Sequence, residues 1–270
     1  MIVILRTPVI SLISLATTLA AIPPATAQHR MMGPDPAPKS THLSQDSVNV
    51  TMHRYHNWPV VEAKVNGRGP YRFIIDTGAP GLFLCDWIAN DLQLDDYPGM
   101  PSGMQIRVAG PGGGKGLSAR MNLVKTLTLG DAEFREMLAI SLKLPLPRAI
   151  AGVIGMGLLQ DTLFTLDYPA GKVTFRRGEL PPADGREILN FTQERQRGSH
   201  PAIQIDVCGE PVEFVIDSGM TGWFRFDPSI VERCGLAYGP VSGLKGQHAD
   251  REVDMQVARL GGSLKHGRFE

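Results

Sequence analysis

Two short apolar runs in the chain each end in an aspartate that is followed by a hydroxyl residue and a glycine. Residues 71–75 precede Asp76-Thr77-Gly78, and residues 212–216 precede Asp217-Ser218-Gly219. Short apolar runs bounded by turn residues are typical of buried β-strands. Each pattern therefore predicts a strand that ends in a turn presenting a single carboxylate.

The first aspartate motif lies among further β signals. Asn66-Gly67 separates two apolar segments, which is the pattern of a β-hairpin. Asp86 is a candidate N-cap of a short helix that continues through Leu92. The apolar segments that predict strands or hairpin arms are 59–65, 71–75, 81–84, 104–108, 117–129, 134–142, 149–159, 163–167 and 172–176. We therefore expect a compact unit of hairpins, short strands and a helix around Asp76.

A glycine-rich tip at 110–116 separates two of these segments. Lys115 invites comparison with a phosphate-binding loop, but Ala109 stands where the first glycine belongs and Gly116 replaces the hydroxyl residue. Glycines at this place suit a mobile hairpin tip. We expect Gly112, Gly113 and Gly114 to form a flap that closes over a ligand, with a simple exposed loop as the alternative.

The surroundings of the first motif recur around the second. Pro59 corresponds to Pro201 at an offset of 142 residues (201 − 59), and Asp76 corresponds to Asp217 at an offset of 141 (217 − 76). Four further positions of the first copy match at the second offset: Gly78, Gly81, Phe83 and Asp86. Such self-similarity indicates a duplicated structural unit.

Composition divides the chain into five segments. Residues 1–27 have the pattern of a signal peptide, because a positive charge precedes an apolar stretch and a small-residue cleavage site; a buried first helix is the alternative. Residues 28–47 are polar and proline-rich, which predicts a flexible leader. The other predicted segments are a first lobe at 48–178, a linker at 179–187 and a second lobe at 188–270. We expect export to the periplasm or secretion. Because the counterpart of Gly155 would lie beyond Glu270, we also expect the second lobe to be incomplete.

Charge and cysteine content limit the partners. The chain has no net charge, so nothing electrostatic favours nucleic acid or an anionic membrane. His53 and His56 are close together, but no further ligands follow at zinc spacing, and we expect neither a metal nor a cofactor. We expect Cys85 to be a buried free thiol, whereas a Cys208–Cys234 bridge in an oxidising compartment stays an open alternative.

Paired aspartates have a specific chemistry. Two carboxylates held side by side do not both ionise easily, so one keeps a proton while the other acts as a base. Together they can activate a water molecule and protonate a leaving amine. Glycine after the hydroxyl residue lets backbone N–H groups approach the carboxylate, and the hydroxyls of Thr77 and Ser218 can brace the two turns against each other.

At these residues the chain resembles the aspartic peptidase superfamily, in particular bacterial retropepsin-like proteins with a signal peptide and two repeats. The resemblance covers about residues 48–270 and rests on residues 73–78, 153–157 and 214–219. It implies a mostly β fold of closed-barrel-like lobes in two tandem copies, the second truncated, with a flap over the cleft. It also implies that Val153, Ile154 and Gly155 form a strand passing behind the loop of Asp76.

These observations favour an exported aspartic endopeptidase that uses Asp76 and Asp217 on a peptide or protein substrate. A variant pairs Asp76 with Asp76 of a second chain in a homodimer. The second hypothesis is a noncatalytic exported protein that binds a peptide or other ligand on the same scaffold, since a fold does not guarantee a function. Two departures from the family pattern motivate these alternatives: the second unit lacks the apolar-apolar-glycine strand, and the tip at 110–116 has no aromatic residue.

Overall fold

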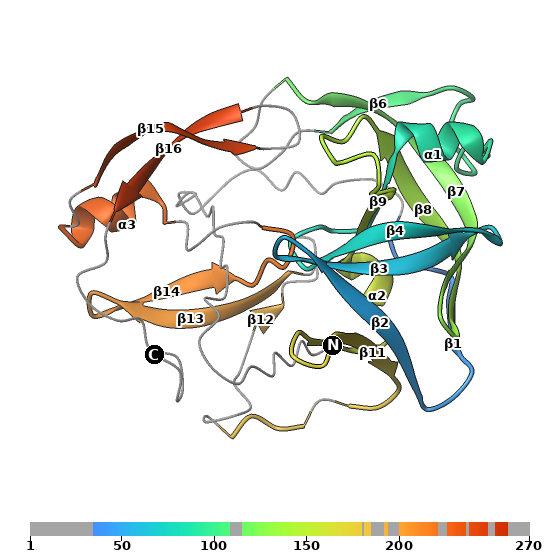
Figure 1. Ribbon diagram of the computed structural model, residues 1–270, viewed down its shortest axis with the longest axis horizontal. Helices are drawn as coiled ribbons and strands as arrows, with labels where there is room; N and C mark the ends of the chain where they lie inside the picture. The colour runs from blue at the N-terminus through green and yellow to red at the C-terminus, as the bar shows by residue number, and fades with distance from the viewer. Residues whose placement is uncertain are drawn as a thin grey trace.

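The computed structural model describes residues 35–108, 115–179, 181–184, 192–193, 200–220, 226–235, 238–247 and 252–258. The predicted signal peptide and the flap glycines Gly112, Gly113 and Gly114 lie outside these ranges. Strands dominate the described chain (Figure 1), which confirms the mostly β expectation. The closed-barrel and tandem-copy parts of that expectation stay predictions.

Residues 35–179, called the N-terminal region from here on, are built around an 11-stranded sheet. Its strands follow the order β10-β11-β2-β3-β4-β9-β5-β8-β7-β6, with β1 paired to β8. They are β1 (Ser40–Leu43), β2 (Ser47–Tyr55), β3 (Trp58–Val65), β4 (Arg68–Asp76), β5 (Leu82–Cys85), β6 (Gln105–Val108), β7 (Leu117–Leu129), β8 (Ala132–Leu142), β9 (Gly152–Gly155), β10 (Leu163–Asp167) and β11 (Lys172–Arg176).

The apolar pattern explains most of these strands. In β2 the buried residues alternate with exposed ones, and in β3 they run together before alternating. Alternation places every second side chain on the core face of the sheet. Asn66 adopts a positive φ of 49° at the tip of the β3–β4 hairpin, which suits the Asn-Gly turn there. The fully buried core side chains include Phe73, Phe134, Phe164 and Phe175.

The prediction of a flexible leader through residue 47 is wrong for its C-terminal part. Ser40–Leu43 forms β1, which pairs antiparallel with β8 so that Leu43 lies opposite Ala132. Backbone hydrogen bonds to a free strand edge can order a segment without apolar periodicity, and the burial of Leu43 adds to them. Pro36 lies farther upstream, close against Gly81 and Gly157.

The helices are short, and one predicted cap is wrong. Helix α1 (Asp86–Asp91) has Cys85 at its N-cap position with no side-chain cap bond, so Asp86 lies in the first turn instead. There its carboxylate still faces the positive end of the helix dipole. The observed helix ends at Asp91, one residue earlier than predicted, because Leu92 is its C-cap. Helix α2 (Met156–Leu159) directly follows β9.

The described residues from 192 to 258 are called the C-terminal region. A three-stranded sheet is formed there by β12 (Thr192–Gln193), β13 (Pro201–Val207) and β14 (Glu210–Val215), with β14 at one edge. Helix α3 (Pro228–Arg233) and the hairpin of β15 (Tyr238–Gln247) and β16 (Glu252–Ala258) complete it. In Figure 1 the β13–β14 hairpin lies on the opposite side of the molecule from β7 and β8.

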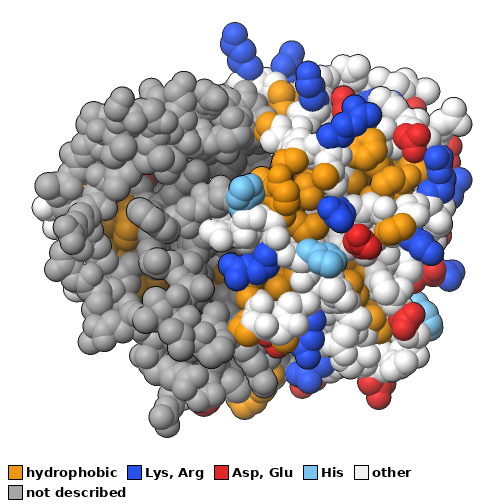
Figure 2. Space-filling view, in the orientation of Figure 1, with side chains coloured by type: hydrophobic (Ala, Val, Ile, Leu, Met, Phe, Trp, Pro, Cys, Tyr) orange, Lys and Arg blue, Asp and Glu red, His pale blue; other side chains and the backbone are white. Residues whose placement is uncertain are grey.

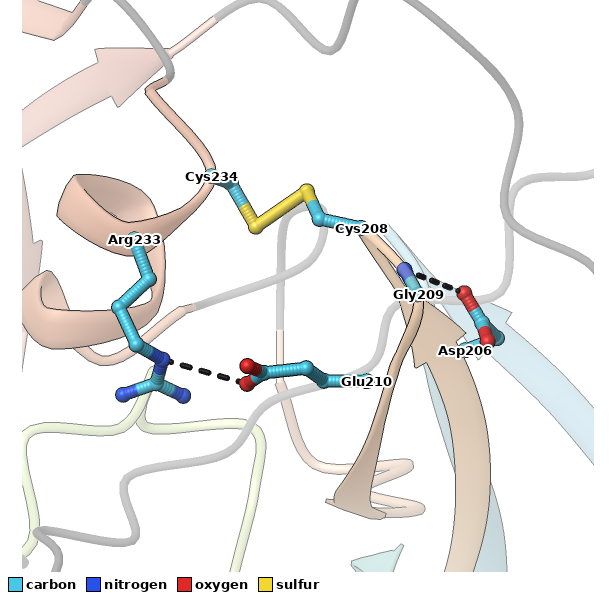
Figure 3. The surroundings of a disulfide bond; sticks show 6 residues. All are labelled: Asp206, Cys208, Gly209, Glu210, Arg233 and Cys234. Atoms are coloured by element: carbon cyan, nitrogen blue, oxygen red, sulfur yellow. Dashed lines mark hydrogen bonds and ion pairs between the residues drawn. A yellow bond between two sulfur atoms is a disulfide. The ribbon is translucent and has the colours of Figure 1, made fainter.

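A disulfide joins Cys208 to Cys234 and decides the open alternative for these two cysteines. It ties the β13–β14 turn to the end of α3, and an ion pair between Glu210 and Arg233 lies beside it (Figure 3). Cys85 is a buried free thiol, as expected. Burial raises the pKa of Cys85 to about 11, so its reactive thiolate is scarce at neutral pH.

Basic and acidic side chains are interspersed on the described part of the face in Figure 2, with hydrophobic side chains between them. This distribution agrees with the zero net charge of the chain. Within the described ranges, no helix is long and apolar enough to cross a membrane.

Candidate active site

Asp76 is held by a strand that passes behind its loop. The strand β9 lies between β4 and β5, parallel to β4 with Gly155 opposite Asp76, and antiparallel to β5 with Ile154 opposite Leu82. Three backbone N–H groups, those of Gly155, Met156 and Gly157, donate to carbonyl oxygens of the loop that follows Asp76, at 2.8–3.0 Å. The structure thus places Val153, Ile154 and Gly155 where the family resemblance puts them.

Glycines are required for this close approach. A Cβ atom added to Gly152 would lie 2.1 Å from the carbonyl oxygen of Phe83, and one added to Gly155 would lie 2.4 Å from that of Ala79. Real Cβ atoms do not approach backbone atoms so closely, so any side chain at these positions would force β9 away from its neighbours.

Asp217 follows β14 and is carried by a smaller sheet. The β13–β14 hairpin places Ala202 opposite Val215, and the N–H of Ile216 donates to the carbonyl oxygen of Pro201 at 2.8 Å. Phe214 is fully buried beneath the hairpin and packs edge-to-face against Phe226. These contacts fix the end of β14 from which Asp217 emerges.

The two aspartate turns are joined by reciprocal hydrogen bonds. The N–H of Thr77 donates to Oγ of Ser218 at 3.0 Å, and the N–H of Ser218 donates to Oγ1 of Thr77 at 2.8 Å. Each hydroxyl then donates across to the opposite strand end, Thr77 to the carbonyl oxygen of Ile216 at 2.5 Å and Ser218 to that of Ile75 at 2.7 Å. Both hydroxyls therefore donate and accept across the contact between the two turns.

The two carboxylates meet over the glycines of these turns. The N–H of Gly78 donates to Oδ1 of Asp76 at 2.8 Å, and the N–H of Gly219 donates to Oδ1 of Asp217 at 2.8 Å. A Cβ atom on Gly78 would lie 2.6 Å from Cγ of Asp217, and one on Gly219 would lie 2.3 Å from Cγ of Asp76. Each carboxylate is thus packed against the opposite turn, and only glycine leaves room for it.

The raised pKa of Asp76 distinguishes this pair from ordinary exposed aspartates. Burial, and after it the neighbouring carboxylate of Asp217, raises the pKa of Asp76 well above its usual range. Backbone hydrogen bonds from Gly78 and Gly219 oppose the rise but only in part. A buried carboxyl beside a second carboxylate keeps its proton into a higher pH range, so the pair can hold one proton between two groups.

A comparison with known families finds one match in the part of the chain that contains Asp76. The sequence model of the aspartyl protease family matches residues 61–158. This part of the chain is therefore similar in sequence to aspartyl proteases. The match spans most of the β3–β4 hairpin, Asp76, β9 and most of α2, whereas Asp217 lies outside it.

Comparison with solved structures gives a likeness of low similarity. A retropepsin-like aspartic protease from Rickettsia conorii is 20% identical in sequence, with a TM-score of 0.36. The alignment covers 50% of this chain and 92% of that chain. No curated protein matches the chain.

Two residues that contact the aspartate turns were not predicted from the sequence motifs. Nε1–H of Trp58 donates to the carbonyl oxygen of Gly219 at 2.6 Å, and Nδ1 of His200 lies 3.2 Å from the carbonyl oxygen of Thr77. A signal was present in the sequence, because each residue directly precedes one of the repeat-matched prolines Pro59 and Pro201.

The predicted flap cannot be judged at its tip, because Gly112, Gly113 and Gly114 lie outside the described residues. Its two arms exist as the antiparallel pair β6–β7, with Val108 opposite Leu117. The guanidinium of Arg107 donates to the carbonyl oxygens of Lys115 and Gly116 at 3.2 Å, which holds the described base of the tip together.

Proposed function

We propose that this protein is an aspartic endopeptidase in which Asp76 and Asp217 of one chain activate a water molecule against a peptide bond. The observation that carries the proposal is the reciprocal hydrogen bonding of Thr77 and Ser218, which brings the two carboxylates together across their glycines. The match of residues 61–158 to the aspartyl protease family supports the same reaction class and a peptide as substrate.

The reaction follows from one proton shared by two carboxyl groups. The ionised member removes a proton from water while the water oxygen attacks the carbonyl carbon, and the protonated member gives its proton to the carbonyl oxygen. Collapse of the tetrahedral intermediate breaks the C–N bond: a carboxyl proton passes to the leaving amine, and a hydroxyl of the intermediate returns its proton to the other carboxylate, so the pair again holds one proton. One water is consumed, and a carboxylic acid and an amine are released. The raised pKa of Asp76 supports a proton on the pair at the pH of the reaction.

A dyad within one chain is favoured over a homodimer that pairs Asp76 with Asp76 of a second copy. The supporting observation is that Gly219 packs against the carboxylate of Asp76 and Gly78 packs against that of Asp217, both in the same chain. A second chain presenting its own Asp76 there would have to displace the turn at 217–219.

We also propose export to the periplasm or the medium. The Cys208–Cys234 disulfide supports this location, because disulfides persist in oxidising compartments. The test is sequencing of the N-terminus of protein purified from an exporting host. A mature N-terminus at Gln28 agrees with cleavage after Ala27, whereas a retained N-terminus in the cytoplasm contradicts the proposal.

The peptidase proposal is tested with a peptide library from acid to neutral pH. The wild type should cleave peptides and be inhibited by pepstatin, and Asp76→Asn should lose activity because its amide can neither accept a proton from water nor pass one on. Asp161→Asn is the matched control, since Asp161 is exposed in the loop before β10. Unchanged cleavage by Asp76→Asn would refute the proposal. Absence of cleavage by the wild type, combined with saturable binding of a library peptide, would establish the noncatalytic binding protein instead.

A further inference from the structure

Two side chains outside the aspartate motifs reach from one region to the aspartate turn of the other. Trp58 begins β3 in the N-terminal region and donates to Gly219 in the turn of Asp217. His200 immediately precedes β13 in the C-terminal region and contacts Thr77 in the turn of Asp76. The two residues occupy equivalent positions of the repeat, because each precedes a matched proline at an offset of 142 (200 − 58).

The contact of His200 fixes its tautomer. A carbonyl oxygen only accepts hydrogen bonds, so the ring nitrogen that faces Thr77 must carry a proton. The neutral ring is therefore protonated on Nδ1, with Nε2 as the free acceptor, and a protonated ring would donate in the same place.

The peptide group that His200 contacts also reaches the carboxylate. Its carbonyl oxygen belongs to Thr77 and faces His200, while its N–H belongs to Gly78 and donates to Oδ1 of Asp76 at 2.8 Å. Hydrogen bonds in such a chain polarise one another, so a donor on the carbonyl strengthens donation by the N–H. Trp58 differs here, because the carbonyl of Gly219 belongs to the next peptide group and not to the Gly219 N–H that donates to Asp217.

We propose that His200 is a positioning residue for Asp76, acting through the Thr77–Gly78 peptide group, while Trp58 braces the opposite turn without a hydrogen-bond path to its carboxylate. The inference rests on the proposed function for its catalytic consequence, but its physical content is the state of Asp76. Donation by His200 stabilises the ionised form of Asp76 and holds its carboxyl group in a fixed orientation.

His200 is itself held in place by the strand leading to the second aspartate. It adjoins Pro201, whose carbonyl oxygen accepts from the N–H of Ile216, the residue before Asp217. A shift of the C-terminal region would therefore move His200 and Asp217 together relative to Asp76. Among the described residues, Asp76 and Asp217 act on each other. Tyr168, in the turn between β10 and β11, also senses the pair: burial, and after it the charges of Asp217 and Asp76, raise its pKa, while the guanidinium of Arg54 above its ring lowers it.

The test uses carboxyl carbon NMR titration of full-length protein, which needs no catalytic activity. His200→Leu removes the donor and should raise the upper apparent pKa of the Asp76–Asp217 pair by roughly a few tenths of a unit, because the Gly78 hydrogen bond to Asp76 stays but is no longer polarised. His200→Asn keeps an N–H donor the same number of bonds from Cα and should restore most of the wild-type titration. Trp58→Phe should shift the upper apparent pKa of the pair less than His200→Leu does. His53→Leu, which replaces an exposed histidine on β2, should leave this pKa unchanged.

Peptide hydrolysis supplies the catalytic readout. For His200→Leu, we expect kcat to fall about fivefold to tenfold with little change in KM, and the alkaline limb of the pH profile to move with the upper apparent pKa seen by NMR. Equal titrations for His200→Leu and His53→Leu would overturn the proposal, and so would equal losses in His200→Leu and His200→Asn. A wild-type ring protonated on Nε2 alone, observed by two-bond nitrogen–proton correlation, would overturn it without any variant. If the wild type shows no hydrolysis, the proposed function fails while the titration and the tautomer still decide the role of His200.

Discussion

The turns of Asp76 and Asp217 have nearly the same sequence but are held by different means. Behind Asp76, the strand β9 passes between β4 and β5, and the end of β9 together with the start of α2 donates three backbone hydrogen bonds to the loop. At Asp217, β14 is an edge strand of a three-stranded sheet, and a disulfide ties the far end of its hairpin to α3. One turn is supported by the backbone of a continuous sheet, and the other by a covalent cross-link and by the first turn.

The difference teaches where the second aspartate obtains its order. The four hydrogen bonds of Thr77 and Ser218 join the turns directly, and Trp58 and His200 add two contacts from one region to the other. The well-supported turn of Asp76 therefore serves as a template on which the turn of Asp217 is positioned. Variants that damage one support and not the other test this asymmetry.

The largest effect is expected from crowding β9. Gly152→Ala places a Cβ atom 2.1 Å from the backbone of β5, which cannot yield like a side chain, and should lower the free energy of unfolding by about 4 kcal/mol. Denaturant unfolding measures this loss. Gly103→Ala is the control, because Gly103 has a positive φ but open space around it, so only the conformational cost of about 1 kcal/mol remains. Similar losses for the two variants would show that the close approach of β9 is unimportant.

The cross-link of the C-terminal region should matter next. Replacing both cysteines, Cys208→Ser with Cys234→Ser, removes a bond that spans 26 residues and should cost about 3 kcal/mol. Amide hydrogen exchange should show the loss in β13 and β14 while β7 and β8 keep their protection. Cys85→Ser, which removes the buried free thiol, serves as the comparison, because it should weaken the N-terminal region instead. Uniform loss of protection in the double variant would contradict separate supports.

A pH-dependent effect should mark Asp76. Because burial and Asp217 raise the pKa of Asp76 in the folded protein, its contribution to stability is complete below the ordinary aspartate pKa of about 3.9 and is lost as the pH rises through the folded value. Asp76→Asn removes this loss, and Oδ1 of asparagine can still accept from Gly78. The melting temperature at neutral pH should therefore rise by roughly 3 °C, and the gain should vanish near pH 3. A gain of the same size in exposed Asp161→Asn, or one that persists in acid, would exclude this cause.

The smallest effect compares two equivalent aspartates at helix starts. Asp227 is the N-cap of α3, and its Oδ1 accepts from the N–H of Ser229 at 2.8 Å, whereas Asp86 makes no such cap bond. Asp227→Ala should cost about 1 kcal/mol and Asp86→Ala about 0.5 kcal/mol or less. Hydrogen exchange in the two helices measures both. Equal costs would mean that capping does not distinguish the two regions.

Periodicity and turn chemistry predicted much of the N-terminal region. The hairpin around Asn66-Gly67 and the pair β10–β11 follow from short apolar runs with turn residues between them. The leader was misjudged because Ser40–Leu43 is ordered by the edge of β8, a partner far away in the sequence. The cap at Asp86 was misplaced by one residue, a difference that depends on backbone angles and not on residue type.

The candidate site was predictable in its motif and in its hydroxyl braces, but not in its ring contacts. Two aspartates in repeated settings indicated the pair, and the hydroxyls indicated the bracing contacts. Trp58 and His200 could not be singled out, because their roles depend on which carbonyl each ring reaches across the two regions. In the β15–β16 hairpin, polar and apolar residues alternate along 252–257, a strand signal that the expectations above did not use.

The most direct test of a dyad within one chain is the rate of peptide hydrolysis by Asp217→Asn relative to wild type. If Asp76 and Asp217 of one chain share the proton, this variant should lose about a thousandfold or more of the wild-type kcat, as should Asp76→Asn. Mixing the two variants should restore nothing, because neither chain then holds both carboxyl groups. Wild-type hydrolysis by Asp217→Asn, together with loss in Asp76→Asn, would contradict the account and point to a site formed by Asp76 of two chains.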